Sequence, residues 1–401
     1  MRGYKGGRVE DQINQDRAFV ASPFGTLGSD SREGKEEEEE ICGAEEEEEE
    51  EDEEEDDPSS CPRFGGGEGT MLLLGVFDGH GNLGEVVSDY ATRRVPEVLS
   101  EKIRRIDAAY AVASPSVRDD DDDDKREEEE EVEAIKRALT ETFVEVDLEG
   151  RADLGIRTGG CTASIVLLRG TRVYLANAGD SRSLVAAYYP TRGGSGEGGG
   201  GAGVGGRVKV LYISREDKPH LPKERERVER MGGRVWMPTA EELSEGDSSR
   251  VFYVDPRTGR SSGGLAMSRS LGDWDLGDVG VIPDPLVHIL DLRDAVAVGE
   301  NAVKPEGEEE EEEGAVFFAV SATDGMFDYL SPQDVAEAVA GGMFGDDKGG
   351  GLLVACGDLV LRAAGGWYDQ FQNDYRDDIA IAASRLLPPP PRARKDGQKI
   401  G

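Results

Sequence analysis

Cysteine is scarce in this chain, and no two cysteines form a CxxC pair. Cys42, Cys61, Cys161 and Cys356 are widely spaced among 401 residues, which argues against a disulfide framework and favours a reducing compartment. No apolar run approaches the roughly 18–20 residues of a membrane span. The first residues also lack the apolar region of a secretory signal. We therefore expect a protein without membrane association, in the cytoplasm, the nucleus or both.

Basic residues are almost absent from three segments that carry most of the negative charge. The chain has 85 acidic and 46 basic side chains, a net charge of −39. Residues 36–57, 119–131 and 306–313 hold 36 of the acids and 2 of the bases, so the remainder is 49 acids against 44 bases, or −5. Such runs repel themselves and bury nothing, and they would also be repelled by nucleic-acid phosphate. Nucleic acid is therefore not an expected partner.

These compositional shifts divide the chain into one folded domain and several insertions. We predict a domain over 1–387, interrupted by disordered acidic insertions at about 32–62, 115–131 and 303–314. A Gly-rich insertion at about 192–206 has the composition of a flexible linker, and the Pro-rich and basic tail 388–401 is predicted to be disordered. The roughly 300 residues that remain are enough for one substantial core.

The periodicity of the remaining residues predicts an α+β fold. Short apolar runs at 18–20, 71–77, 161–168, 172–177, 182–187, 316–323 and 378–384 predict strands. The turns at Arg169-Gly170 and Gly179-Asp180 suggest that three of these strands form an antiparallel meander. Helices are predicted from Leu83 onward, with a kink or division at Pro96, and near 132–148, 221–231, 332 onward and 352–364. Antiparallel strand runs with helices between them are typical of the α+β class.

Two of the predicted strands end in Asp-Gly. The run 71–77 leads into Asp78-Gly79-His80-Gly81, and the run 316–323 leads into Asp324-Gly325. Each places a carboxylate at the rim of a sheet, beside a glycine that can turn sharply. Two carboxylates delivered in this way are what a hard divalent cation needs, so the pair predicts a metal site. The alternative is a tight turn with a solvent-facing acid.

Other polar motifs are less informative when each is taken alone. Gly179-Asp180 fits an ordinary turn, and the segment Gly264–Asp273 has no chemistry that follows from its residue types. Arg269 within that segment could pair with a carboxylate or brace a loop, and the structural role is favoured. Asp328 and the pair Asp377-Asp378 add acids near the ends of predicted strands. If several such acids meet at one rim, they require a counter-ion.

Taken in order, these motifs resemble those of the protein phosphatase 2C family of metal-dependent Ser/Thr protein phosphatases. The motifs are NQD, GVFDGHG, GGCTAS, ANAGDSR, KP before a helix, GLAMSRSLGD, ATDGMFD and DDIAI, from Asn14 to about Leu387. The resemblance implies a four-layer αββα sandwich, two antiparallel sheets with helices outside. It also implies hydrolysis of phosphoserine and phosphothreonine in proteins by a water activated between two Mg²⁺ or Mn²⁺ ions. Phosphoproteins would be the partners, and we expect a monomer.

The resemblance assigns roles residue by residue. His80 would be the general acid that protonates the leaving Ser or Thr oxygen. The metal ligands would be Asp78, the Gly79 carbonyl, Asp324 and Asp377, with Asp16 beside them, and with Asp180 at a third, looser metal near Asp328. The chain departs from the family pattern where an Arg commonly contacts phosphate, because Asp11 occupies that position and Arg8 is the nearest alternative. Gln15, Asp378 and the pair 216–217 are further departures.

Three alternatives remain open at this level. Cys356 and Arg362 fit the C-x5-R pattern of Cys-dependent phosphatases, although their segment is apolar and helical, which favours a core helix. A pseudophosphatase that binds phosphoproteins, or regulates through its acidic segments, is favoured by the missing Arg and disfavoured by the intact acids. The acidic runs could also form a weak cation-binding or histone-binding surface beside an active domain.

Overall fold

Two antiparallel sheets form the centre of the molecule. The computed structural model describes residues 13–24, 71–113, 121–190, 206–244, 247–255, 257–295, 314–345, 350–372 and 374–387. The first sheet has the strand order β1 (Arg17–Phe24), β2 (Met71–Phe77), β5 (Ala163–Arg169), β6 (Arg172–Ala178), β13 (Leu286–Asp291). The second has the order β15 (Ile381–Leu386), β14 (Val316–Ala322), β7 (Arg182–Pro190), β8 (Gly206–Ile213). Every pairing within these two sheets is antiparallel.

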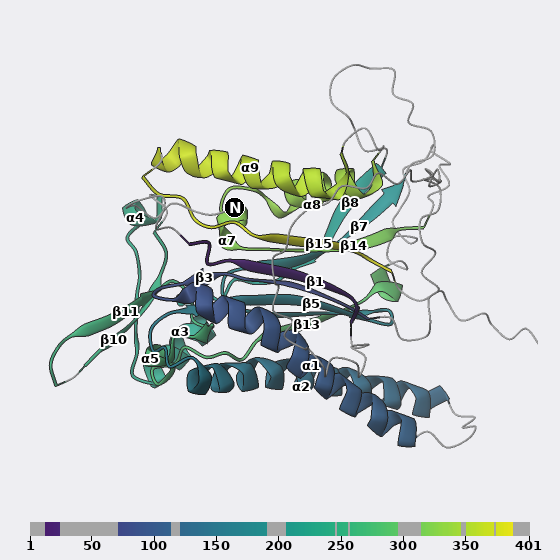
Figure 1. Cartoon of the computed structure of the whole chain (residues 1–401), viewed down its shortest axis with the longest axis horizontal. Coiled ribbons are helices and arrows are strands. Elements are labelled where there is room, and N and C mark those ends of the chain that lie inside the picture. The colour runs from purple at the N-terminus through teal and green to yellow at the C-terminus, as the bar shows by residue number, and fades with distance from the viewer. Residues whose placement is uncertain are drawn as a thin grey trace, which may run out of the picture.

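The two sheets pack face to face, and helices cover their outer faces. Helices α1 (Gly84–Ala113) and α2 (Asp121–Asp153) lie on the first sheet, and α8 (Pro332–Phe344) and α9 (Gly351–Phe371) lie on the second. Figure 1 shows the four layers in order, from α9 at the top to α2 at the bottom. This confirms the predicted αββα sandwich.

The position of β2 explains its uninterrupted apolar sequence. Successive side chains of a strand point to opposite faces. Leu73 and Phe77 belong to the core beneath α1 and α2, whereas Leu74 and Val76 belong to the core between the sheets. All seven residues of the strand are buried because both faces are covered. Asp78 therefore follows a rigid, fully buried strand, which fixes where its carboxylate lies.

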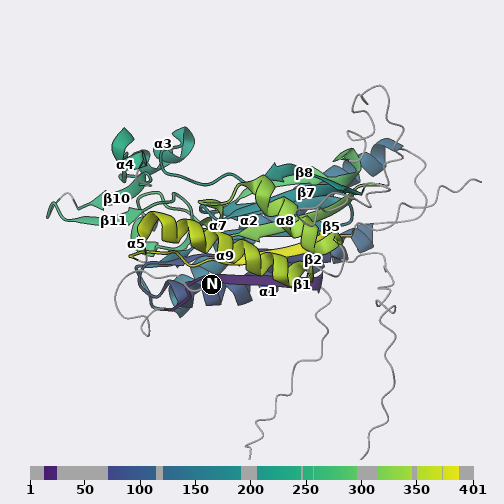
Figure 2. The same ribbon diagram turned by 90° about the horizontal axis from the view of Figure 1, so that it is seen from above.

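Smaller elements extend beyond one end of the sandwich. A three-stranded sheet joins β3 (Gly79–His80), β4 (Gly160–Cys161) and β12 (Leu271–Gly272). Another joins β9 (Arg234–Trp236), β10 (Arg250–Val254) and β11 (Ser261–Leu265), next to helices α3 (Pro222–Arg230) and α4 (Ala240–Ser244). Figures 1 and 2 show β10, β11, α3 and α4 projecting past the sheets at the end where β3 lies. The single-turn helices α5 (Trp274–Gly277) and α7 (Asp324–Phe327) lie at the same end.

The predicted meander is wrong at its second turn. β5 and β6 pair as expected, but β7 pairs with β14 and β8 in the other sheet. The Gly179-Asp180 segment is therefore a crossing between the sheets, where Gly179 adopts a φ of 116°. A Cβ on Gly179 would lie 2.6 Å from the Thr162 side chain, so this crossing requires glycine. Asp180 thereby lies at the edge between the two sheets rather than in a hairpin.

The predicted disorder of 115–131 is wrong for residues 121–131, which form the start of α2. Acidic side chains are favourable at a helix N-terminus, and this run also finds cationic partners. Glu131 lies 2.6 Å from Arg169, which also contacts Asp107 of α1, and Glu128 pairs with Arg172, so α2 is attached to the β5–β6 turn. Pro96 lies inside α1, which continues through it undivided.

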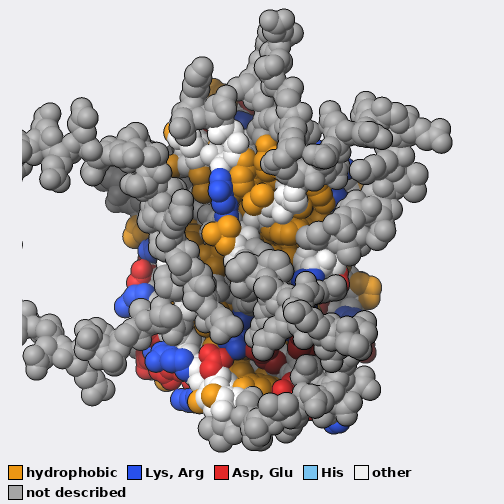
Figure 3. All heavy atoms as spheres, turned by 90° about the vertical axis from the view of Figure 1, so that its right-hand side faces the viewer, with side chains coloured by type: hydrophobic (Ala, Val, Ile, Leu, Met, Phe, Trp, Pro, Cys, Tyr) orange, Lys and Arg blue, Asp and Glu red, His pale blue; other side chains and the backbone are white. Residues whose placement is uncertain are grey.

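The remaining predicted insertions lie outside the described residues, apart from Gly206 at the start of β8 and Gly314 before β14. Figure 3 views the sandwich from the end away from β3 and shows hydrophobic side chains, with scattered charges, between the grey segments. None of the described helices has the length and apolar character that a membrane crossing requires.

Candidate metal and phosphoryl site

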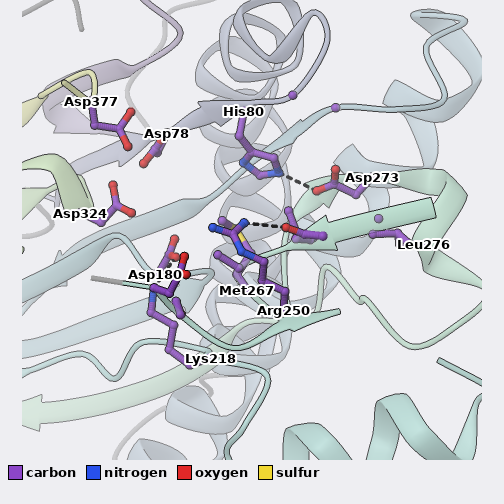
Figure 4. A pocket seen from close by; sticks show the side chains of 18 of the residues that line it. Asp78, His80, Asp180, Lys218, Arg250, Met267, Asp273, Leu276, Asp324 and Asp377 are labelled. Carbon is purple, nitrogen blue, oxygen red and sulfur yellow. Dashed lines mark hydrogen bonds and ion pairs between the residues drawn. The ribbon is translucent and has the colours of Figure 1, made fainter. Parts of the chain in front are cut away.

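Five strand ends from both sheets deliver carboxylates to one end of the sandwich. Each of these acids directly adjoins or lies close to a strand end, so its backbone is fixed by the sheets. Figure 4 shows four of them on one side of a cavity. The five are Asp16 before β1, Asp78 after β2, Asp180 after β6, Asp324 after β14 and Asp377 before β15. The structure thus brings together the predicted metal-site acids.

Three of these acids, Asp16, Asp78 and Asp180, are buried and the other two are half-buried, without enough counter-charge. Both carboxylate oxygens of Asp16, and Oδ1 of Asp180 and of Asp324, are buried without a hydrogen-bond partner among the described residues. Burial, with Asp378 nearby, raises the pKa of Asp16 to about 7. Burial also raises the pKa of Asp78 well above its usual range, with the charges of Asp16 and Asp324 adding to it. Uncompensated carboxylates of this kind are costly, and a bound cation would remove the cost.

The backbone around Asp78 is packed so closely that its neighbour must be glycine. The Gly79 N–H donates to the Gln15 carbonyl at 3.2 Å, and a Cβ on Gly79 would lie 2.5 Å from that same oxygen. The Asp78 N–H donates to the Thr162 hydroxyl at 3.1 Å, and the Thr162 N–H donates to the Asp78 carbonyl at 2.9 Å. The Asp78-Gly79 unit is therefore held from both sides.

Asp180 has a lysine partner that sequence reasoning left without a role. The Lys218 ammonium donates to Asp180 Oδ2 at 2.8 Å, and Asp180 itself is 1% exposed. Burial alone would lower the pKa of Lys218, but the charges of Asp180 and Asp324 raise it. Asp328 lies at the exposed rim of the same cavity. This part of the cluster is thus partly neutralised, unlike the part around Asp78.

His80 is paired with an acid that the sequence did not single out. Its Nε2 lies 2.7 Å from Oδ2 of Asp273, whereas its Nδ1 is buried and has no hydrogen-bond partner among the described residues. Burial by itself would lower the pKa of His80, but the Asp273 carboxylate outweighs it and raises the pKa. Figure 4 shows the other ring nitrogen on the side facing the carboxylates. The protonated ring is therefore favoured beside the acid cluster.

An arginine from β10 also reaches the cavity, which has a volume of about 940 Å³. Arg250 Nη1 donates to the Gly264 carbonyl at 2.7 Å, and Arg250 lines the same cavity as His80 and Lys218. The sequence did not predict this role, because no motif near Arg250 indicates that it begins a strand at the cavity. Asp273 had a weak signal, since it ends the motif Gly264–Asp273 for which no chemistry was found.

The remaining sequence hypotheses have clear outcomes. Arg8, the candidate phosphate contact, lies outside the described residues, as does Asp11. Arg269 pairs with Glu224 through both Nε and Nη2 at 3.0 Å, which is the predicted structural role. Cys356 lies in the middle of α9 with a half-buried thiol whose pKa is raised by burial. A Cys-dependent phosphatase needs a thiolate in a loop of backbone amides, so that alternative is wrong.

The carboxylates fit a divalent cation in character. The unpartnered oxygens of Asp16 and Asp324 are hard ligands facing a polar cavity, and nothing of opposite charge among the described residues contacts those oxygens. No three described His, Cys, Asp or Glu side chains form a complete ligand shell as they stand. Mg²⁺ does not require one, because it takes one or two carboxylates and keeps several waters.

Comparison with known proteins agrees with this fold. The family model described as protein phosphatase 2C matches residues 41–345, which is about three quarters of the chain. The geometry defines a protein with an αββα sandwich fold and an acidic cluster at one end of the two sheets. The chain belongs to the protein phosphatase 2C family.

Individual relatives are distant. The probable protein phosphatase 2C 48 of Oryza sativa subsp. japonica is 29% identical over 282 residues, covering 70% of this chain and 67% of its own. The probable protein phosphatase 2C 41 of Arabidopsis thaliana is 27% identical over 277 residues, covering 68% of this chain and 63% of its own. The crystal structure of serine-threonine phosphatase 2C from Toxoplasma gondii has a TM-score of 0.52 at 18% identity, over 79% of this chain and 84% of that one. That likeness shows the shared fold.

Proposed function

We propose that this protein hydrolyses phosphoserine and phosphothreonine in other proteins, with Mg²⁺ or Mn²⁺ as cofactor. The observation that carries the proposal is the group of buried, uncompensated carboxylates at the sheet ends, with a paired histidine facing it. Acids alone would suggest only a cation site. The histidine and a cationic side chain in the same cavity add what a phosphoryl transfer needs.

The metal ligands would be drawn from the strand-end acids. A pair of ions would be held by Asp78, the Gly79 carbonyl, Asp324 and Asp377. Asp16 would sit next to the pair, and Asp180 would hold a third, weaker ion with Asp328 near it. When bound, a pair of divalent cations supplies an activated water and neutralises charge on the phosphoryl group.

His80 would act on the leaving group. Its Nε2 is engaged by Asp273 at 2.7 Å, which leaves Nδ1 free to donate toward the cavity. A Ser or Thr alkoxide is a poor leaving group, so a positioned proton at Nδ1 contributes to breaking the phosphorus–oxygen bond. The Asp273 carboxylate raises the pKa of His80, which favours the protonated ring that a general acid requires.

Arg250 would contact the phosphoryl oxygens. One of its nitrogens is held by the Gly264 carbonyl at 2.7 Å, which fixes the guanidinium plane and leaves other N–H groups toward the cavity. A planar fork of donors suits phosphate oxygens. Arg250 would thus supply the contact that the sequence assigned to Arg8.

The test is hydrolysis of a phosphothreonine peptide by the full chain. We expect turnover with Mn²⁺ and none after chelation, because the carboxylates alone bring no electrophile to the phosphoryl group. Asp324→Asn with Mn²⁺ should resemble the chelated wild type. Equal rates in all three samples would exclude a metal-dependent phosphatase.

A matched control separates the pseudophosphatase alternative. Asp369→Asn changes an exposed acid on α9, away from the cavity, and should leave the rate unchanged. A protein that binds the phosphopeptide with Mn²⁺ present but shows no release of phosphate would support the pseudophosphatase instead.

A further inference from the structure

Asp273 has an unusual backbone conformation that the surrounding chain holds in place. Its φ is 46°, in the left-handed region that residues other than glycine rarely occupy. It follows Gly272, whose φ is 91°. The Asp273 N–H donates to the Gly159 carbonyl at 3.0 Å, and the Gly272 N–H donates to Asp147 Oδ1 at 2.8 Å. Such a conformation is unfavourable for a residue with a Cβ and persists where its surroundings enforce it.

The strained backbone aims a buried carboxylate at His80. Asp273 is 5% exposed, and its Oδ2 accepts a hydrogen bond from the Ser270 hydroxyl at 2.7 Å as well as lying 2.7 Å from His80 Nε2. A Cβ on Gly160 would lie 2.5 Å from that same oxygen, so the strand beside it is shaped to leave room for it. Among the described residues, the ring of His80 is the ion-pair partner of this carboxylate.

These contacts decide which ring nitrogen faces the acid cluster. Because Nε2 is engaged by Asp273, Nδ1 is the nitrogen on the side of the carboxylates, where it is buried and has no hydrogen-bond partner within the described part of the chain. A histidine without this partner could turn its ring, because the hydrogen bond at one ring nitrogen sets the orientation and the role of the other. The buried carboxylate fixes the ring orientation in the way that a second residue fixes a metal-ligating or catalytic histidine.

We propose that Asp273 is the positioning residue for His80, holding the ring so that Nδ1 delivers a proton to the departing Ser or Thr oxygen. This inference rests on the proposed phosphatase function. In the step, the bond from phosphorus to the Ser or Thr oxygen breaks and that oxygen takes the electron pair and the Nδ1 proton. The attacking water forms the new phosphorus–oxygen bond, and the proton it loses restores the ring.

The experiment compares two substrates that differ in their need for that proton. p-Nitrophenyl phosphate releases a stable phenolate unaided, whereas a phosphothreonine peptide releases an alkoxide. For Asp273→Asn in the full chain with Mn²⁺, we expect kcat on the peptide to fall about 100-fold, within the range of general acid catalysis. On p-nitrophenyl phosphate it should fall less than about 3-fold, with KM unchanged for both. Asn tolerates the left-handed conformation, so the backbone is preserved.

Two further variants complete the test. Asp278→Asn changes an exposed acid at the end of α5 that does not line the cavity, and both rates should stay at wild-type values. Asp273→Asn combined with His80→Gln should be no slower on the peptide than His80→Gln alone, because both changes remove the same proton delivery. Additive losses would overturn the proposal.

The remaining outcomes are also decisive. Equal losses on both substrates would show that Asp273 only braces the loop, and no loss on either would show that it has no role. If Asp273→Asn does not fold, as judged by thermal melting, Ser270→Ala takes its place, with a smaller loss of about 5-fold on the peptide alone. Wild-type protein that is inactive on both substrates would instead overturn the proposed function.

Discussion

Two groups of buried charge lie at the same end of this molecule, and they are built in opposite ways. Around Glu224 on α3, three arginines surround one carboxylate: Arg269, Arg215 and Arg227 all contact its oxygens. Burial would raise the pKa of Glu224, but Arg269 and Arg227 outweigh it and lower the pKa to about 2. Around Asp78 the acids face one another, and burial raises the pKa of Asp16 to about 7.

The difference separates a structural cluster from a binding cluster. In the compensated network the opposite charges satisfy one another, and its function is to attach α3 to the segment that carries Arg269. An uncompensated one is unfavourable until something else binds. We infer that holding Asp78, Asp324 and Asp16 together without a cation lowers the free energy of unfolding. Binding of a cation would raise that free energy again.

The largest effect is expected where the uncompensated cluster is altered. Asp324→Asn should lower kcat on a phosphothreonine peptide about 1,000-fold, as loss of several kcal/mol of charge stabilisation implies. The same change should raise the melting temperature of the metal-free protein, because it removes a carboxylate whose charged form is opposed by burial and by the neighbouring Asp180 and Asp377. Steady-state kinetics with Mn²⁺ checks the first part, and calorimetry of the metal-free protein checks the second. A lower metal-free melting temperature would mean that the carboxylate is structurally compensated after all.

The next largest effect should come from the compensated cluster, and on stability. Glu224→Gln leaves Arg269 and Arg227 without their shared anion, at a cost of about 3–5 kcal/mol in the free energy of unfolding. Urea unfolding measures it, with the exposed Glu226→Gln as matched control. Because the folded pKa of Glu224 is depressed, its stabilisation is full above the unfolded value near 4.5 and is lost as pH falls toward 2. That acid-sensitive component should be missing from the variant.

Arg250 lies between the two extremes, since a carbonyl rather than a carboxylate holds it. Arg250→Ala should raise KM for the phosphopeptide about 10-fold, the loss expected for one charge-assisted phosphate contact, with little change in melting temperature. Arg257→Ala, whose side chain is 90% exposed on the same β10–β11 segment, is the control. Equal KM values for the two variants would remove Arg250 from the phosphoryl site.

The smallest effect concerns the pH dependence of stability that the acid cluster gives to the metal-free protein. The folded pKa of Asp16 is raised to about 7, so its contribution to stability is full below the unfolded value near 3.8 and is lost as pH rises through 7. Lowering pH from 8 to 5.5 should therefore stabilise the metal-free protein by about 2 kcal/mol relative to Asp16→Asn. With Mn²⁺ the trend should reverse, because protons compete with the ion for the carboxylates. Urea unfolding at both pH values decides it.

Much of this architecture was legible in the sequence. The continuous apolar run before Asp78 predicted a buried strand with its ends at 71 and 77, and the Ser331-Pro332 signal predicted the start of α8, where the Ser331 hydroxyl accepts from the Asp334 N–H. Both are local signals. The predictions for the β6–β7 crossing and for the acidic start of α2 were wrong, because each structure depends on partners distant in sequence, such as Arg169 for Glu131.

The sequence by itself determined which chemistry is available: strand-end carboxylates, one histidine beside them, and the order of motifs that marks the family. Only the tertiary structure decided how those groups are used. Asp273 lies 193 residues from His80, and Arg250 comes from a strand with no distinguishing motif, so neither spacing nor composition could link them to the site. A side chain's chemistry is written in one position, whereas its burial, its partners and its pKa are properties of everything folded around it.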